Sequence, residues 1–263
     1  MDTTQIFAYT GGALFIYMMC WYVASLIKHD FGIVDTAYGI GYSVAAVTAL
    51  LLTKTYEFMQ LFVIVLVILW GWRLSIHIFI RNSKKGVEDY RYTKMRNDWG
   101  ESANIQALFK VFILQGVIIY IIDLCVLYTI IFAPTSKFNW ITIVGISVWI
   151  IGYFFEVVGD HQLKNFKNNP DNKGMIMDKG LWQYTRHPNY FGEATMWWGL
   201  YFITLSTNNQ KGWWTIVSPL LITYLLLFVS GVPLLEKHYE GNTQFEEYKK
   251  RVSIFFPLPP KSI

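Results

Sequence analysis

The sequence predicts an all-α membrane protein, a single membrane-embedded unit over residues 1–263 with seven transmembrane helices. Only 15% of the 263 residues are charged, whereas about a quarter are charged in soluble domains. Hydrophobic residues make up 54% of the chain, and they are grouped in blocks of about 20, the length that a helix needs to cross a bilayer. Because backbone groups in lipid must be hydrogen-bonded internally, we expect these blocks to be helices rather than open strands.

Seven apolar segments account for the predicted spans. They cover residues 6–27, 31–52, 58–80, 107–133, 140–158, 190–205 and 213–235. The polar stretch 82–106 carries periodic charges and aromatic residues, so we expect an interfacial helix there. The stretch 160–189 contains a run rich in Asn, Pro and Gly, which is typical of turns.

The distribution of lysine and arginine predicts the orientation. Seventeen of the 22 basic residues lie in the stretches that follow the first, third, fifth and seventh segments, and only three lie in the stretches on the other side. Basic residues are enriched on the cytosolic side of membrane proteins. We therefore expect the N-terminus outside, the C-terminus in the cytosol, and both long polar loops in the cytosol.

Ionisable residues within the second and third segments are candidates for function, because charges in a membrane are costly. Asp35 is followed at the next helical turn by Tyr38, and Arg73, His77 and Arg81 follow one another at four-residue steps. Asp35 is expected only about 6 Å below the cytosolic surface, and Arg73 about 12 Å below Arg81, at a rise of 1.5 Å per residue. The competing interpretation is a structural Asp35–Arg73 ion pair, with Arg81 reaching back to the interface.

The densest polar cluster lies at residues 180–193, at the entrance to the sixth segment. Pro188 suits the first helical position, where its missing N–H costs little. The free N–H groups of that helix are expected to favour an anionic ligand. Asn189, Glu193 and Trp197 recur at four-residue steps and so line one helical face. A helix entrance that is only structural does not need this set of side chains, so the cluster favours a functional site.

Two further charged groups flank this cluster. Residues Glu156, Asp160, Lys164 and Lys167 form one stripe as the fifth segment leaves the membrane, and a solvated helix face is an equally simple explanation of that stripe. After the seventh segment come Glu236, His238, Tyr239, Tyr248 and Arg251.

At this point the sequence resembles a known family. The pattern is Gly180-Leu181-Trp182-x-Tyr184-x-Arg186-His187-Pro188-Asn189-Tyr190-Phe191-Gly192-Glu193, followed by Trp197-Trp198-Gly199. It is similar to the C-terminal signature of the steroid 5-alpha-reductase-like membrane proteins, and most closely to their bacterial DUF1295 branch. The segment Trp70-Gly71-Trp72-Arg73-Leu74 and the tail from Leu234 to Pro257 match the same branch. The resemblance covers residues 35–260 and is strongest over 180–199.

The resemblance implies a seven-helix enzyme that transfers hydride from NADPH to an activated carbon–carbon double bond of a lipid-like substrate, with a steroid or an isoprenoid as candidates. It implies cofactor contacts at Asp160, Lys164, Lys167, Tyr184, Arg186, His187, Asn189, Glu193, Trp197, His238 and Arg251. The clusters read from the sequence add Arg73, His77, Arg81, Tyr190 and Glu236 to the expected cofactor site. The cofactor-binding half is thus expected at about residues 140–263.

One departure from the family concerns catalysis. Steroid reductases use a carboxylic acid and a tyrosine from the N-terminal helices to hydrogen-bond the substrate carbonyl, and Asp35 matches the acid. Trp70 stands where the tyrosine is expected, three residues before Arg73. Tyr38 is the candidate replacement, one turn beyond Asp35, so Asp35 and Tyr38 are the expected catalytic residues.

Two other function classes compete with the reductase. Isoprenylcysteine carboxyl methyltransferases and related enzymes share the Arg-His-Pro-x-Tyr signature but bind S-adenosylmethionine, which needs no phosphate cradle, so the basic residues at 164–186 favour NADPH. A channel or other non-enzymatic protein predicts polar residues through the membrane midplane, where the fourth segment offers only Gln115 and Asp123. The expected partners are membrane lipid and an apolar small molecule, with no nucleic acid and no metal, and the oligomeric state is left open. The expected location is the bacterial inner membrane or the endoplasmic reticulum, with the active site facing the cytosol.

Overall fold

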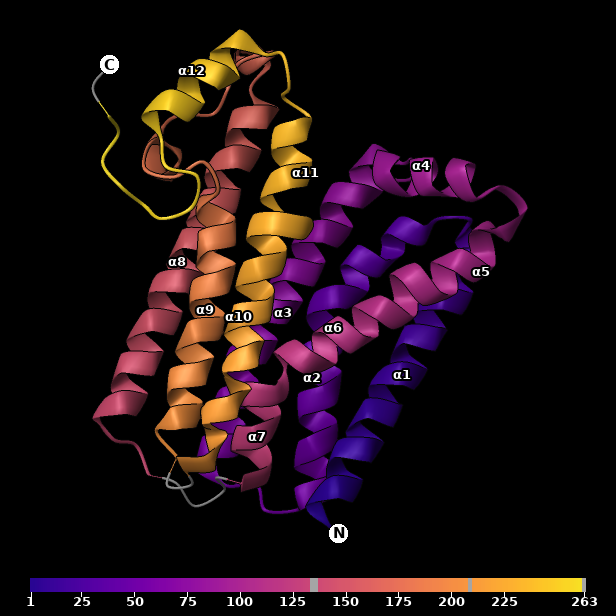
Figure 1. Cartoon of the computed structure of the whole chain (residues 1–263), viewed down its shortest axis with the longest axis vertical. Helices are drawn as coiled ribbons and strands as arrows, with labels where there is room; N and C mark the ends of the chain where they lie inside the picture. Colours follow the sequence, from indigo (N-terminus) through magenta and orange to yellow (C-terminus); the bar gives the residue numbers. More distant parts are fainter. Residues whose placement is uncertain (133–136, 208–209, 262–263) are drawn as a thin grey trace. The chain divides into compact units, whose positions relative to one another are not determined.

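The computed structural model describes residues 1–132, 137–207 and 210–261, and it confirms the all-helical class (Figure 1). The described residues contain no strand, only an isolated bridge between Thr185 and Ser253. Large apolar side chains such as Ile16, Ile76 and Phe154 are exposed on the helices. Side chains of this kind are stable where lipid rather than water surrounds the helices. The chain is therefore an integral, multi-pass membrane protein.

Six helical stretches among the described residues are long and apolar enough to cross a membrane. They are Thr3–Lys28, Phe31–Thr53, Phe58–Lys84, Tyr90–Ile122, Trp140–Asn168 and Gly212–Lys237. The expected sixth span is present as helix α9, Pro188–Leu205, but it is not among the six. Its first turns carry Asn189 and Glu193, which lower its mean hydropathy. The count of seven spans and the orientation of the termini stay predictions.

The chain divides into two compact units. Unit 1 comprises Met1–Phe138 and Thr207–Thr215, and unit 2 comprises Asn139–Ser206 and Ile216–Ile263. The helices of unit 1 are α1 (Thr3–Lys28), α2 (Val34–Thr53), α3 (Phe58–Lys85), α4 (Tyr90–Trp99), α5 (Ala103–Ala107), α6 (Leu114–Ile122) and α7 (Leu124–Phe132). A 3-10 turn at Phe31–Ile33 precedes α2, and a π-helical stretch at Leu108–Ile113 joins α5 to α6.

In unit 1, α2 and α3 cross with their backbones in contact. A Cβ placed on Gly39 would lie 2.1 Å from the Gly71 carbonyl oxygen, and one on Gly71 would lie 2.2 Å from the Gly39 oxygen. Helices approach this closely only where both residues lack a side chain. Gly39 thus allows α2 to pack closely on α3, and Gly41 leaves room for the Ile119 side chain.

The fourth predicted segment is not one straight helix. It consists of α5, the π-helical stretch, α6 and α7, and it breaks at the buried residue Asp123, where α7 leaves α6 (Figure 1). The expected end of this segment at residue 133 lies outside the described residues. A helix is present within 82–106, α4 at Tyr90–Trp99, and its interfacial position stays a prediction.

Unit 2 is built on two long helices that lie side by side, α8 (Trp140–Asn168) and α9 (Pro188–Leu205) (Figure 1). Glycines recur on α8 every seven residues and face two glycines of α9. A Cβ on Gly152 would lie 2.6 Å from the Gly192 carbonyl oxygen, and one on Gly145 would lie 2.8 Å from the Gly199 oxygen. We call this contact the glycine seam. It fixes the register of α8 against α9, and with it the positions of the polar residues at the C-terminal end of α8 and the N-terminal end of α9.

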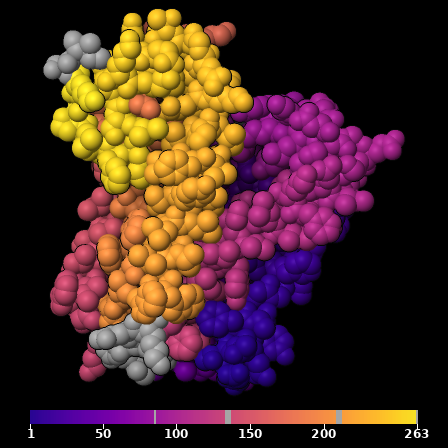
Figure 2. Space-filling view, in the orientation of Figure 1, coloured from indigo at the N-terminus to yellow at the C-terminus, as the bar shows by residue number. Residues whose placement is uncertain are grey.

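The rest of unit 2 is a chain of short elements. They are α10 (Val217–Tyr224), a π-helical stretch (Leu225–Val229), α11 (Val232–Lys237) and α12 (Thr243–Arg251). The 3-10 turn at Gln210–Ile216, nearly all of it in unit 1, precedes α10 in the chain. The expected span at 213–235 is thus interrupted at Ser230 and Gly231. Gly231 is pressed so closely against the Leu226 carbonyl oxygen that an added Cβ would lie 2.4 Å from it. The space-filling view shows the C-terminal segment, in yellow, packed directly against neighbouring segments of unit 2 (Figure 2).

Candidate functional site

The first turns of α9 meet α8 at a polar face. The Asn189 amide nitrogen donates a hydrogen bond of 3.1 Å to the Asp160 carboxylate. Glu156 and Glu193 are buried on the same two helices. The Asn189 side-chain oxygen is also buried, and it has no hydrogen-bond partner among the described residues. A buried acceptor of this kind is stabilised when a ligand donates to it.

The turn before α9 is held on α8 by two hydrogen bonds. The Trp182 indole donates to the Gly159 carbonyl at 3.1 Å, and the Leu181 N–H donates to the Gln162 side chain at 2.9 Å. Gly180 has a φ of +64°, a conformation that glycine adopts without strain. The sequence Gly180-Leu181-Trp182 therefore sets the path by which the chain enters α9.

Arg186 lies at the centre of an internal network. Its Nε donates to Glu236 at 2.8 Å, and one terminal nitrogen donates to the Val252 carbonyl at 2.7 Å and to the Lys249 carbonyl at 3.4 Å. The backbone N–H of Arg186 donates to the Ser253 carbonyl at 2.8 Å. With 8% of its surface exposed, Arg186 ties the turn before α9 to α11 and to the C-terminal tail.

His187 caps the start of α9 and shares Glu236 with Arg186. Its Nε2 lies 3.1 Å from a Glu236 carboxylate oxygen, and its ring stacks on Tyr190 with centroids 5.5 Å apart. Burial lowers the pKa of the His187 imidazole below its ordinary value of 6.5, while the hydrogen bond to Glu236 acts in the opposite direction. The imidazole of the folded protein is therefore neutral at pH 7.

This lowered pKa predicts a loss of stability in acid. As the pH falls through 6.5, the His187 of the unfolded chain takes up a proton before that of the folded chain. The contribution of His187 to the free energy of unfolding is thus present above that pH and is lost as the pH falls below it. Going from about pH 7.5 to about pH 5.5, we expect the thermal midpoint of the wild type to fall further than that of His187→Gln, which cannot titrate. Differential scanning fluorimetry measures the two thermal midpoints, and equal falls would contradict the lowered pKa of His187.

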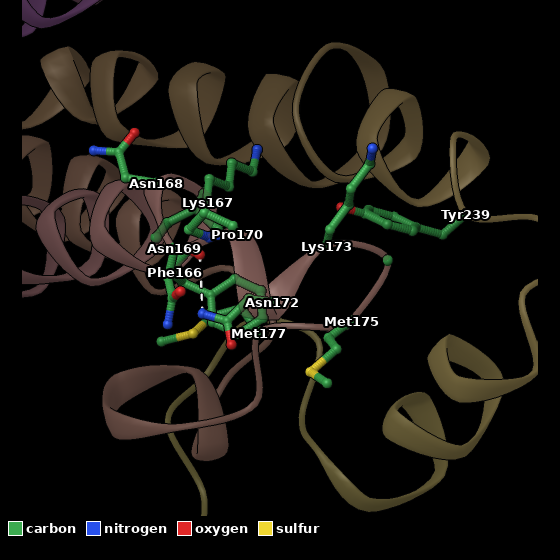
Figure 3. A pocket seen from close by; sticks show the side chains of 12 residues that line it. Phe166, Lys167, Asn168, Asn169, Pro170, Asn172, Lys173, Met175, Met177 and Tyr239 are labelled. Carbon is green, nitrogen blue, oxygen red and sulfur yellow. Dashed lines mark hydrogen bonds between the residues drawn. The ribbon is translucent and has the colours of Figure 1, made fainter.

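A cavity of about 350 Å³ opens beside the C-terminal end of α8, within the size range of small-molecule sites. Its walls combine basic, amide, thioether and aromatic side chains. They come from Leu163, Phe166, Lys167, Asn168, Asn169, Pro170, Asn172, Lys173, Gly174, Met175, Met177 and Tyr239. Figure 3 shows the ammonium groups of Lys167 and Lys173 pointing to the same side of this loop.

Local hydrogen bonds give the cavity wall its shape. The Asn172 amide donates to the Phe166 carbonyl at 3.0 Å, the dashed line of Figure 3. Two residues in or beside this wall also pack on a buried cluster. Ile176 and Tyr239 contact the cluster formed by Phe245, Tyr248 and Val252. Sequence reasoning selected Lys167 but missed Lys173, whose signal was its position in a turn-rich loop that follows a basic helix end.

The other expected cofactor residues of unit 2 occupy varied positions. Trp197 is fully buried in α9, while Lys164 and Tyr184 are exposed. The ring of His238 contacts Tyr239 edge-on, at 5.4 Å between centroids. Arg251 is 45% exposed and lies 3.6 Å from Asp178. Within unit 2 the structure thus brings together three groups: Asp160 with Asn189, Arg186 and His187 with Glu236, and Lys167 with the cavity.

In unit 1 the expected acid has partners that the sequence did not reveal. The Asp35 carboxylate accepts a hydrogen bond from Arg91 at 2.7 Å and another from the Tyr92 hydroxyl at 2.6 Å. Both partners lie on α4, and the ion pair that the structure gives Asp35 is the one with Arg91. The ring of Tyr38 packs edge-on against Tyr42, at 5.2 Å between centroids. The phenol that contacts Asp35 is therefore that of Tyr92.

A second group of contacts holds α4 in place. The Glu88 carboxylate accepts from the Phe31 N–H at 2.7 Å and from Arg96 at 3.0 Å, and the Arg96 guanidinium lies 3.8 Å above the Phe31 ring. Arg73 and His77 are half-buried on α3, whereas Arg81 is exposed and donates to the Asn82 side chain at 3.3 Å. The α4 contacts join segments more than fifty residues apart, which explains why local sequence patterns did not indicate them.

The chain is similar to one protein family and to several known proteins. A family model described as "Protein of unknown function (DUF1295)" matches residues 20–252. The human protein 3-oxo-5-alpha-steroid 4-dehydrogenase 1 is 27% identical over 125 residues, which are 46% of this chain and 44% of that protein. Its Bos taurus counterpart is 29% identical over 115 residues, 43% of this chain and 40% of that protein. The Schizosaccharomyces pombe protein "Uncharacterized protein C9.08c" is 28% identical over 94 residues, 30% of this chain and 33% of that protein.

These similarities are partial, since the chain spans less than half the length of the curated relatives it matches. No solved structure gives a significant match. The family model, in contrast, covers most of the chain, and the Arg-His-Pro-Asn-Tyr turn it includes forms the densest polar network of unit 2. The chain therefore belongs to the DUF1295 family of steroid 5-alpha-reductase-like membrane proteins.

Proposed function

We propose that this protein is a membrane oxidoreductase that transfers hydride from NADPH to an activated carbon–carbon double bond of a lipid-like substrate. The observation that carries the proposal is the arrangement along α8. Asp160 and Asn189 form a hydrogen-bonded pair at one point of the helix, and Lys167 and the cavity follow two turns later. A dinucleotide carries amide and hydroxyl groups, which suit the Asp160–Asn189 pair. It also carries phosphates, which suit Lys167 at the cavity.

The residues of unit 2 fit NADPH chemically. The buried side-chain oxygen of Asn189 has no partner among the described residues and suits an amide or hydroxyl donor. Lys167 and Lys173 suit phosphate groups, because an ammonium forms charge-assisted hydrogen bonds to phosphate oxygens. NADPH, when bound, supplies the hydride. The protein's part is then to hold and orient the cofactor and to polarise the acceptor.

The substrate end of the proposal rests on Asp35. The Asp35 carboxylate can only accept hydrogen bonds, as can a substrate carbonyl, so its proposed part is to hold Arg91 and Tyr92, whose N–H and O–H groups can donate to that carbonyl. We propose a steroid or isoprenoid enone as the substrate class. The steroid is supported by the name of the similar proteins, 3-oxo-5-alpha-steroid 4-dehydrogenase 1. The assignment of Arg73, His77 and Arg81 to the cofactor site stays a prediction.

The methyltransferase alternative is less well supported. Five of the six curated matches are named 3-oxo-5-alpha-steroid 4-dehydrogenase 1, and none is named as a methyltransferase. S-adenosylmethionine has no phosphate, so it gives no reason for a cavity lined by two lysines. The assignment to a bacterial branch, the cytosolic position of the site and the bacterial or endoplasmic reticulum membrane stay predictions.

The test is a comparison of ligand-induced stabilisation in purified, detergent-solubilised protein. A ligand raises the thermal midpoint according to its affinity for the folded state. We expect NADPH to stabilise the wild type more than NADH, and S-adenosylmethionine to have no effect. Lys173→Met should reduce the response to NADPH, because it removes an ammonium that is proposed to bind a phosphate. Lys94→Met, which removes an exposed lysine of α4, is the matched control. A response to S-adenosylmethionine alone would reject the proposal.

Asp35→Asn gives a separate prediction for turnover. Positioned acid–base groups contribute about a hundredfold to ten-thousandfold to rate, so we expect NADPH oxidation with a 3-oxo-4-ene steroid to fall at least about a hundredfold. Tyr92→Phe should also lower turnover, because the Tyr92 hydroxyl donates to the Asp35 carboxylate. Unchanged turnover in Asp35→Asn would remove Asp35 from the catalytic site.

A further inference from the structure

His187 is in a state that its hydrogen bonds define. A carboxylate can only accept, so the neutral imidazole must carry its proton on Nε2, the nitrogen that lies 3.1 Å from Glu236. The other nitrogen, Nδ1, then has a free lone pair and can only accept. This atom is buried and has no hydrogen-bond partner among the described residues.

The surroundings hold the ring in this state. Glu236 is itself fixed by Arg186, whose Nε donates to the same carboxylate oxygen at 2.8 Å. The imidazole plane is held by Tyr190, whose ring is inclined to it by only 11°. A ring fixed on one edge and on one face cannot turn to satisfy Nδ1 elsewhere. The unmet acceptor is thus a built feature of the turn, and such a group is costly when it stays unpaired.

We propose that His187 Nδ1 accepts a hydrogen bond from an O–H or N–H group of the bound nucleotide, and that Glu236 is the positioning residue that fixes the required tautomer. This inference rests on the proposed function, since the nucleotide is the ligand of that same site. It changes two expectations from the sequence. Glu236 acts through His187 and Arg186 rather than on the cofactor, and His187, at the start of α9, recognises a hydrogen-bond donor rather than an anion.

Other groups around His187 are consistent with a neutral acceptor. The burial that lowers its pKa favours the uncharged ring. The charged side chains that act on it are Glu236, from α11, and Arg186, from the preceding turn. The Arg186 guanidinium is occupied by Glu236 and by the Val252 and Lys249 carbonyls, so it is not the donor that His187 lacks.

Two substitutions of the same residue separate the two nitrogens. The amide oxygen of asparagine lies near the position of Nδ1, whereas the end of a glutamine side chain reaches the position of Nε2. We expect His187→Asn to keep NADPH affinity within about threefold and His187→Gln to lose about tenfold, equivalent to about 1.4 kcal/mol. Neither variant removes Arg186 or Glu236, so both are expected to fold. Similar losses in both variants would overturn the proposal.

Nitrogen NMR of histidine-labelled protein provides a readout that a purely structural role does not change. The protein has five histidines, and the signal missing from His187→Gln identifies this one. We expect the free wild type to show a protonated Nε2 and an unprotonated Nδ1, and NADPH to shift Nδ1 towards the value of a hydrogen-bonded acceptor. In Glu236→Gln, the amide can donate to Nε2, so a protonated Nδ1 and about tenfold weaker NADPH binding are expected.

The outcomes distinguish this inference from the function it rests on. If the wild type does not bind NADPH, the proposed function fails and the ligand part of the inference fails with it, while the NMR tautomer still tests the role of Glu236. If the wild type binds NADPH but its Nδ1 is protonated or its signal does not move, the inference alone is overturned.

Discussion

Gly152→Ala is expected to destabilise unit 2 by at least about 3 kcal/mol, at the upper end of the usual cost of overpacking. The new Cβ would lie 2.6 Å from both the Gly192 carbonyl oxygen and the Met196 backbone nitrogen. These are backbone atoms of α9, so no side-chain rotation can relieve the contact. The helices must move apart, and Asp160 and Asn189 must separate with them. Thermal unfolding in detergent measures the effect, and NADPH stabilisation should be lost in parallel.

Gly12→Ala is the matched control for this prediction. Gly12 lies within α1, and an added Cβ there meets nothing within 4 Å. Alanine is the better helix former by about 1 kcal/mol, so this variant should be neutral or slightly more stable. If the two alanine variants unfold at the same temperature, the glycine seam is not required for stability.

Arg186→Met is expected to destabilise the protein by about 3–5 kcal/mol, the usual result of removing one partner from a buried ion pair. It would leave Glu236 without its guanidinium and the Val252 carbonyl without a donor. The C-terminal tail should then detach from the turn before α9. Limited proteolysis, which should cleave the tail of the variant faster, and thermal unfolding both measure this.

Arg251→Met is the comparison for Arg186→Met. Its guanidinium is 45% exposed and lies 3.6 Å from Asp178, and an exposed pair of this kind contributes about 0–1 kcal/mol. The double variant Arg186→Met/Glu236→Leu should be more stable than the sum of its single changes, because it leaves no buried charge unpaired. Equal effects of Arg186→Met and Arg251→Met would mean that Arg186 is not a structural centre.

The sequence allowed the helical class to be predicted because hydropathy and length are local properties. It allowed the turn before α9 to be predicted as functional because so many polar side chains are concentrated there. The role of Arg186 was not predictable, since two of its acceptors are the backbone carbonyls of Lys249 and Val252, and a carbonyl has no sequence signature. The sequence does not distinguish an arginine that binds a ligand from one that binds carbonyl groups of the protein itself.

The breaks in the helices were missed for a related reason. Asp123 interrupts an apolar run that remains apolar on average, and Gly231 lies within another. The signals were present: an acid inside a membrane segment, and Pro233 at the start of α11. The contacts of Asp35 with α4 could not be predicted from local sequence patterns, because Arg91 and Tyr92 lie 56 and 57 residues further along the chain.

The glycine seam also limits the routes by which a substrate can reach the site. Where two backbones touch at Gly145, Gly152, Gly192 and Gly199, not even a methyl group fits between them. An acyl chain or sterol ring therefore cannot slip from the bilayer between α8 and α9. This side of unit 2 is a closed wall, and a hydrophobic molecule must arrive past other helices.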